Sequence, residues 1–208
     1  MTDQHEDCLE RAFRARHQAL RNALYHIARR GWLDGWNRFF NLLVILGGTS
    51  AAADLTRGNP KASLVLGGVI TLIGALQLVF DFGGRARAHE TLQRRYYNLA
   101  ADIQSKLIPM EQDCASWEAE MSRIAADEPP TLRALDAVAD NQATAALLGS
   151  NRPRLKITAF QNFTRQIFTH NAGIFPPDPN WLAFDTELTR PDNPARQELP
   201  TASDEGKA

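Results

Sequence analysis

Two long runs of apolar residues, separated by a short polar segment, dominate the pattern along the chain. The first run, residues 36–55, reads WNRFFNLLVILGGTSAAADL, and its uncharged core covers residues 39–53. The second run, residues 62–82, contains seventeen consecutive uncharged residues at positions 64–80. A helix of seventeen residues rises about 26 Å, which is close to the thickness of the hydrocarbon core of a bilayer. The pattern predicts two transmembrane helices.

The polar segment between the runs, DLTRGNPK at residues 54–61, predicts a tight reversal at Gly58, Asn59 and Pro60 and hence an antiparallel hairpin. Basic residues favour one orientation of this hairpin. Only two basic residues, Arg57 and Lys61, lie in the loop. Eight basic residues flank the outer ends of the hairpin: Arg21, Arg29, Arg30, Arg38, Arg85, Arg87, Arg94 and Arg95. The positive-inside rule then places both termini in the cytoplasm. Because the first run is short and carries Arg38, a soluble protein with two core helices stays open as an alternative.

Small and polar residues of the second run share one stripe when it is drawn as a helix. The stripe consists of Ser63, Gly67, Thr71, Gly74, Gln77 and Asp81, and Asn41 and Gly48 lie on one side of the first run. Such a stripe packs helices against each other, or, if several copies assemble, lines a pore with Thr71, Gln77 and Asp81. Two helices are too few to enclose a pathway, so conduction requires a homo-oligomer.

The segments outside the runs also show helical periodicity. Residues 5–31 predict an amphipathic helix with Leu9, Phe13, Leu20, Leu24 and Ile27 on its apolar face. After the second run, Leu92, Tyr96, Leu99 and Ile103 recur at intervals of three or four and predict the interface of a cytoplasmic helical bundle. Pro109 predicts a kink or a restart near residue 108. Thr131 is the expected N-cap of a helix over residues 131–148, and an amphipathic stretch at 155–168 either packs on the bundle or lies on the membrane.

We therefore predict an all-α membrane protein in which a two-helix transmembrane hairpin joins a cytoplasmic helical bundle. The expected regions are a cytoplasmic amphipathic helix at 1–35, the hairpin at 36–82, a cytoplasmic helical region at 83–175 and a mostly disordered tail at 176–208.

Composition and motifs favour no enzyme, no cofactor and no metal site. The net charge of −1 argues against direct nucleic-acid binding, which requires a basic face. Cys8 and Cys114 are far apart in the sequence, so we expect neither a disulfide nor a metal site from them. The five histidines show no metal-ligand spacing, and His89 is expected to be a structural histidine, with pH sensing as the alternative.

Two stretches resemble the SLATT family of two-transmembrane effector domains from prokaryotic nucleotide-signalling conflict systems. They are ARAHETLQRRYYNLAADI at residues 86–103 and DEPPTLRALDAVADN at residues 127–141, where His89, Leu92, Leu99 and Pro129–Pro130 stand at the family's positions. The resemblance extends over residues 8–150 and implies a membrane effector of antiviral or abortive-infection defence in the bacterial inner membrane. It also favours the pore interpretation of the stripe.

No sensor domain is fused to these residues, so the resemblance implies that a separate sensor protein or a nucleotide second messenger acts as the trigger. The alternative function is a membrane-anchored scaffold that conducts nothing and recruits a cytoplasmic partner through the helices after Arg85.

Overall fold

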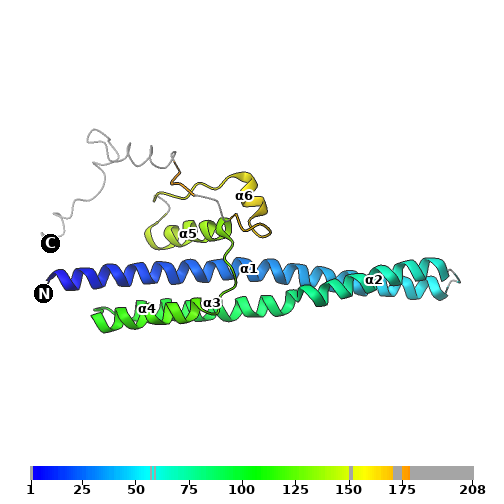
Figure 1. Cartoon of the computed structure of the whole chain (residues 1–208), viewed down its shortest axis with the longest axis horizontal. Coiled ribbons are helices and arrows are strands. Elements are labelled where there is room, and N and C mark those ends of the chain that lie inside the picture. Colours follow the sequence, from blue (N-terminus) through cyan, green and yellow to red (C-terminus); the bar gives the residue numbers. More distant parts are fainter. Residues whose placement is uncertain (1, 57, 59, 150–151, 171–174, 179–208) are drawn as a thin grey trace, which may run out of the picture. The chain divides into compact units, whose positions relative to one another are not determined.

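The computed structural model describes residues 2–56, 58, 60–149, 152–170 and 175–178. In these residues the regular structure consists of helices, joined by turns and loops, and an isolated β-bridge between Leu155 and Pro177. The helices are α1 (Thr2–Thr56), α2 (Pro60–Phe80), α3 (Phe82–Ser105), α4 (Glu111–Ala125), α5 (Arg133–Leu148) and α6 (Ala159–Thr164). The chain divides after Pro129 into two compact units, which are described separately (Figure 1).

Helix α1 is a single helix of 55 residues, about 80 Å long. It continues from the predicted amphipathic segment into the first apolar run, so the predicted boundary between residues 35 and 36 does not interrupt the helix. Gly31 and Gly35 lie inside it, where a glycine weakens a helix without ending it. No proline occurs in α1, and the polar and apolar segments therefore form one rigid element.

Helices α2 and α3 run back along α1, and α4 turns again to pack against both α1 and α3 (Figure 1). Pro60 is the first residue of α2, and at the first position of a helix the missing backbone N–H of proline costs least. Gly58 precedes it with a φ of 79°, which glycine adopts readily. Between α2 and α3, Asp81 adopts a left-handed φ of 41°, and its carboxylate accepts a hydrogen bond from the Gly84 backbone N–H at 2.9 Å. A Cβ at Gly84 would collide with this carboxylate, so a larger residue there would displace the Asp81 side chain from its capping position.

The core of the first unit is formed by a different face of α1 from the one predicted. Its buried residues are Cys8, Ala15, Ala19, Ala23, Leu92, Tyr96, Leu99, Ile103, Cys114, Trp117 and Ile124. The predicted apolar face is wrong, because Leu9, Phe13 and Ile27 are exposed, whereas the alanines of α1 face α3. Small side chains on one helix leave room for the large side chains of the other, such as Tyr96.

The restart predicted near residue 108 is a full reversal. Helix α3 ends at Ser105 and α4 begins at Glu111, with Lys106 paired to Asp113 at 3.1 Å across the turn. Arg11 of α1 bonds Glu118 of α4 at 2.9 Å, and Arg95 of α3 pairs with Asp127 after α4. These exposed ion pairs join three helices, and each contributes little alone.

In the second unit, α5 and α6 differ in their limits from the predicted helices. Leu132, and not Thr131, is the N-cap of α5, and Gly149 ends it with a φ of 87°. The predicted amphipathic stretch at 155–168 is helical only over α6, because Leu155 pairs with Pro177 in the β-bridge. The disorder predicted for the tail concerns mainly residues 179–208, which lie outside the described residues.

One helical stretch among the described residues, Pro60–Ser105, is long and apolar enough to cross a membrane, and none of its most apolar window is buried. This window belongs to α2, the second predicted span. The described part of the first predicted span, in α1, does not meet the same criterion, so a transmembrane hairpin stays a prediction.

Candidate functional site

The contact between the second half of α1 and α2 is antiparallel and is marked by three points seven residues apart on α2. The Ser63 hydroxyl donates to the Ala51 carbonyl at 3.1 Å, near the loop. Ile70 lies against Gly47, so closely that a Cβ added to Gly47 would be 2.8 Å from Cγ1 of Ile70. At the other end, the Gln77 amide donates to the Asn41 side-chain oxygen at 2.7 Å.

Gln77 also reaches the side-chain oxygen of Asn37 at 3.3 Å, so three amide side chains form one ladder between the helices. An amide placed among acyl chains without a partner would be costly, and pairing three of them at the helix contact removes that cost. The structure therefore brings together Asn41 and Gln77, two of the residues selected from the sequence.

Ser63, another residue of the predicted stripe, also contacts α1, but Thr71 and the glycines of the stripe differ from it. The Thr71 hydroxyl bonds the carbonyl of Gly67 within α2, at 2.8 Å. A Cβ built at Gly48, Gly67 or Gly74 would meet open space, and Gly47, which was not selected, is the glycine at the helix contact. These glycines therefore have room beside them, although Gly67 and Gly74 are half-buried and Gly74 lines the groove described next.

A groove of about 690 Å³ lies where α2 bends into α3. Asn37 of α1, Gln77 and Asp81 line it together with Arg87 of α3. Leu78 and Phe82 also line the groove, so its walls combine polar and apolar side chains. Asp81, selected from the sequence, combines this position with its role as the cap of α3.

Aromatic rings in successive contact lie at the end of α2 that is nearest Asp81. Trp32, Trp36, Phe39 and Phe40 of α1 contact one another in sequence, Phe40 stacks on Phe82 at 5.4 Å, and Phe82 stacks on Phe80. The Arg29 guanidinium lies 4.7 Å over the Trp32 ring. Amphipathic rings with a nearby cation are typical of the boundary between hydrocarbon and headgroups.

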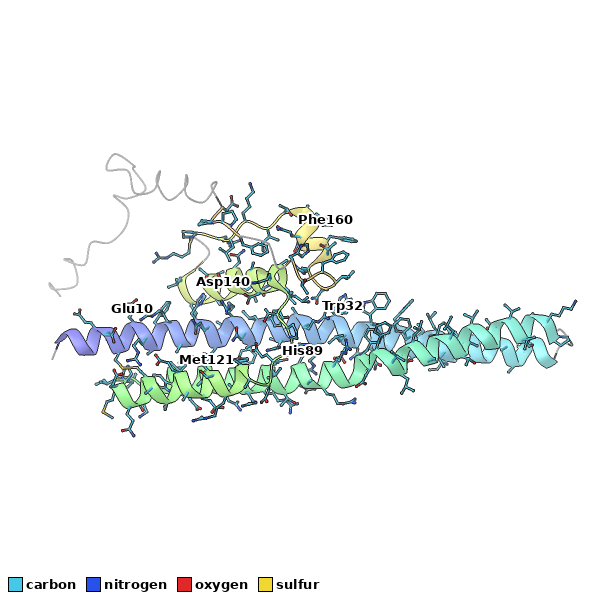
Figure 2. The ribbon with its side chains drawn as sticks, viewed as in Figure 1. Glu10, Trp32, His89, Met121, Asp140 and Phe160 are labelled. Atoms are coloured by element: carbon cyan, nitrogen blue, oxygen red, sulfur yellow. A yellow bond between two sulfur atoms is a disulfide. The ribbon has the colours of Figure 1, made fainter. Side chains whose placement is uncertain are left out.

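A buried histidine pair lies between α1 and α3, beyond this aromatic layer (Figure 2). His26 and His89, 1% and 5% exposed, face each other with their Nδ1 atoms 2.8 Å apart. His26 Nε2 lies 3.2 Å from a Glu128 carboxylate oxygen, to which the buried Tyr96 hydroxyl donates at 2.5 Å. The His26 ring also stacks on Tyr96. The cluster joins α1, α3 and the segment after α4.

Burial and charge shift the protonation of this cluster. Burial, together with His26 and Arg29 nearby, lowers the pKa of His89 from 6.5 to about 4. Burial alone would raise the pKa of Glu128, but the hydrogen bonds from His26 and Tyr96 outweigh it and hold this pKa below its usual value. Burial and the Glu128 carboxylate raise the pKa of Tyr96. At neutral pH, Glu128 is charged and His89 is neutral.

The charge on Glu128 fixes part of the hydrogen bonding in this cluster. An ionised carboxylate only accepts, so His26 carries a proton on Nε2 and donates it to Glu128. Across the 2.8 Å contact one Nδ1 atom donates and the other accepts, so the two rings do not both carry a proton on Nδ1.

The expectation that the two cysteines stay apart is wrong. Cys8 of α1 and Cys114 of α4 form a disulfide, with Cα atoms 6.5 Å apart, although 106 residues separate them in sequence. Both side chains belong to the buried core. The reversal after α3 carries α4 back along α1, which the spacing of the cysteines alone does not reveal.

The four residues selected for the bundle interface, Leu92, Tyr96, Leu99 and Ile103, lie in the core of the first unit at 4% exposure or less. His26 and Glu128 were missed as members of a site. A signal existed, because His26 continues the stripe of Ala15, Ala19 and Ala23, and His89 precedes Leu92 on the stripe of α3. Two histidines on facing core stripes are candidates for contact.

The described residues contain no group of three or more histidine, cysteine or acidic side chains suited to hold a metal ion. No protein-family model, curated protein or solved structure matches this chain, so the resemblance to the SLATT family stays a prediction.

Proposed function

We propose that the chain is a membrane effector of a prokaryotic antiviral system, in which α2 and the second half of α1 cross the inner membrane and several copies open an ion pathway when triggered. The observation that carries the proposal is the surface of α2. Eight large apolar side chains on this helix are between 43% and 82% exposed: Leu64, Val65, Val69, Leu72, Leu76, Leu78, Val79 and Phe80.

This surface is unfavourable in water. Full burial of one such side chain contributes about 1.5–3 kcal/mol, so removing eight partly exposed ones from water contributes on the order of 10 kcal/mol. That is comparable with the net stability of a whole domain. A bilayer supplies this environment, and contiguous apolar patches of this size mark interaction surfaces. The second half of α1 adds Leu42, Ile45 and Leu46, each more than half exposed, beside α2.

The polar groups of the same segment support a pathway formed by several copies. Asn37, Asn41 and Gln77 lie together at the helix contact. Two of them, Asn37 and Gln77, also line the groove together with Asp81 and Arg87. Two helices do not enclose a channel. No heavy atom lies within 4 Å of a Cβ built at Gly67 or Gly74, so these half-buried positions leave room beside the α1–α2 contact for the close approach of a helix from a second copy.

The remaining helices of the first unit would regulate the pathway. Because α3 follows α2 after the bend at Asp81 and packs on α1 over its length, a ligand or sensor that shifts α3 would also move the apolar pair. Both termini lie in the cytoplasm in this proposal, and the trigger is a separate sensor or a nucleotide second messenger.

The test is conductance of the purified protein in planar bilayers, together with growth and membrane potential after induction in bacteria. We expect discrete currents and depolarisation, and we expect Gln77→Leu to lose both while it still inserts. Leu64→Ala is the matched control, because Leu64 is 78% exposed on α2, does not line the groove and should not affect currents. A Gln77→Leu protein that conducts like the wild type would refute the role of the ladder.

A scaffold without conductance is the second candidate, and the turn between α3 and α4 favours it. Leu107, Ile108 and Met110 are 93%, 71% and 64% exposed at this tip, which suits recruitment of a soluble partner. Replacing Leu107 and Ile108 with lysine should abolish the cellular phenotype of a scaffold. It should leave the currents of a self-assembled channel intact.

A further inference from the structure

We propose that residues 152–170 of the second unit form a docking surface for the anionic headgroups of the same membrane that α2 enters. The proposal rests on the proposed membrane insertion of α2 and extends it, because it assigns a lipid contact to a part of the chain outside the spans.

The segment is held at both ends by α5, so its shape is determined. The Asn141 side chain bonds both the backbone N–H and the carbonyl of Leu155, at 2.7 and 2.9 Å. Near the other end, the Arg133 N–H donates to the Thr169 carbonyl at 3.2 Å. Between these points, Thr158 and Gln161 form a reciprocal capping box that starts α6.

Large apolar side chains project from this supported segment. Phe160, Phe163, Ile167 and Phe168 are 67%, 85%, 61% and 54% exposed, and Phe160 is labelled in Figure 2. The polar Thr164 is instead buried, and its hydroxyl contacts His170 Nε2 at 2.9 Å. The usual distribution of side chains is therefore inverted here, with the apolar groups outside, which is typical of a binding surface.

The charges of the segment identify the occupant. Arg152, Arg154, Lys156 and Arg165 lie among or beside the aromatic residues, and no acidic residue occurs between Arg152 and Pro177. Exposed phenylalanines flanked by basic side chains are typical of segments that lie in the boundary layer of an anionic bilayer. An anionic bilayer places negative headgroups directly above an apolar layer, which matches this combination of basic and aromatic side chains.

The second unit is attached to the first unit at a point near the end of α2. Glu128 lies two residues before the second unit and contacts His26. His26 in turn contacts His89, which follows Asp81 by eight residues in the sequence. Eight residues of helix correspond to about 12 Å. The second unit is thus attached within a short distance of the end of α2, and attachment raises the effective concentration of its surface at the membrane.

The experiment uses the full chain in vesicles of phosphatidylcholine with or without phosphatidylglycerol. A polarity-sensitive fluorophore is attached at Phe163→Cys in a Cys8→Ser/Cys114→Ser background. We expect a blue shift and quenching by headgroup-labelled lipid in the anionic vesicles. Both effects should be lost when Lys156 and Arg165 are replaced by glutamate, and weakened by salt.

Two further probe positions separate the possible failures. A probe at Gln142, which is exposed on α5, should stay in water, whereas a probe at Val79 of α2 should be quenched by lipids labelled in the acyl chain. If Val79 is quenched and Phe163 stays in water, docking is refuted and insertion stands. If Val79 is also unquenched, the proposed insertion fails. A Phe163 probe that leaves water without lipid quenching would assign the surface to a protein contact and overturn the proposal.

Discussion

Acidification should destabilise the first unit through His89. This side chain is buried, neutral at pH 7, and faces His26, Arg29 and the Glu128 carboxylate. The unfolded chain accepts a proton on this histidine near its ordinary pKa of 6.5, whereas the folded chain accepts it only near pH 4. Between these values the unfolded state binds more protons, so the stability falls as the pH falls.

The size of the effect follows from the two pKa values. Integrated from about pH 7 to about pH 5, the proton uptake by the unfolded state lowers the free energy of unfolding by about 2 kcal/mol. The full loss approaches about 3 kcal/mol near pH 4. Glu128 has a pKa below its usual 4.5, so it loses its charge only at lower pH. Measurements above about pH 5 therefore exclude the contribution of Glu128 to the change in stability.

The assay is urea unfolding of the full chain in a nonionic detergent, followed by circular dichroism at several pH values. His89→Gln is the control, since its amide can still donate to His26 Nδ1 but does not titrate. The stability difference between wild type and His89→Gln should change by about 2 kcal/mol between pH 7 and pH 5. A difference that is independent of pH would show that His89 titrates normally in the folded protein and would refute the argument.

Three further predictions test contacts in the first unit. Tyr96→Phe removes the hydrogen bond to the charged Glu128 and should lower the free energy of unfolding by about 1.5–3 kcal/mol in the same urea assay; no change would mean that water replaces the hydroxyl. Gly47→Val should clash with Ile70 and weaken the α1–α2 contact by about 1–3 kcal/mol, as measured by unfolding in mixed micelles. Gly48→Val is the control, because a side chain at Gly48 meets open space and should leave the stability unchanged. Equal effects of the two substitutions would contradict the packing. If this end of the chain is cytoplasmic, Cys8 and Cys114 should be thiols in growing cells and form the disulfide on oxidation, as thiol alkylation under denaturing conditions would detect; a pair oxidised in untreated cells would overturn the orientation.

The helical class was predictable because it depends on local patterns. Uncharged runs, the turn residues before Pro60 and the break around Pro129–Pro130 are properties of a few neighbouring positions, and the limits of α2 and α5 lie within two residues of the predicted ones. The continuity of α1 was not predictable in the same way. Its polar and apolar halves differ in composition, and a change of composition resembles a boundary even when no residue interrupts the helix.

The facing side of α1 was misassigned because hydrophobicity alone gives leucine and phenylalanine more weight than alanine. In a tightly packed pair of helices, the side with small residues approaches most closely, and α1 presents Ala15, Ala19 and Ala23 to the large side chains of α3. The choice between two stripes depends on the shape of the partner helix. One helix considered by itself does not contain that information.

The contacts that matter most for the candidate site are long-range ones. His26 meets His89 across 63 residues and Glu128 across 102, and both contacts depend on how far α3 and α4 travel before they reverse. A change of one residue in either helix would rotate these side chains away from each other. Periodicity identified the stripe that includes His89, but only the register of three helices brings its partners to it.

This arrangement connects the histidine cluster to the amide ladder through α1 itself. His26 and Asn37 lie eleven residues apart on one uninterrupted helix, about 16 Å along its axis. The partner residues are not connected by one helix, because the bend at Asp81 separates His89 on α3 from Gln77 on α2. A displacement of α1 relative to α3 at the histidines therefore moves Asn37 and Asn41 rigidly, while α2 can be left in place by rotation at Asp81. Such a displacement would strain the hydrogen bonds of Gln77, and we expect the protonation of His89 and the opening of the groove to be coupled in this way.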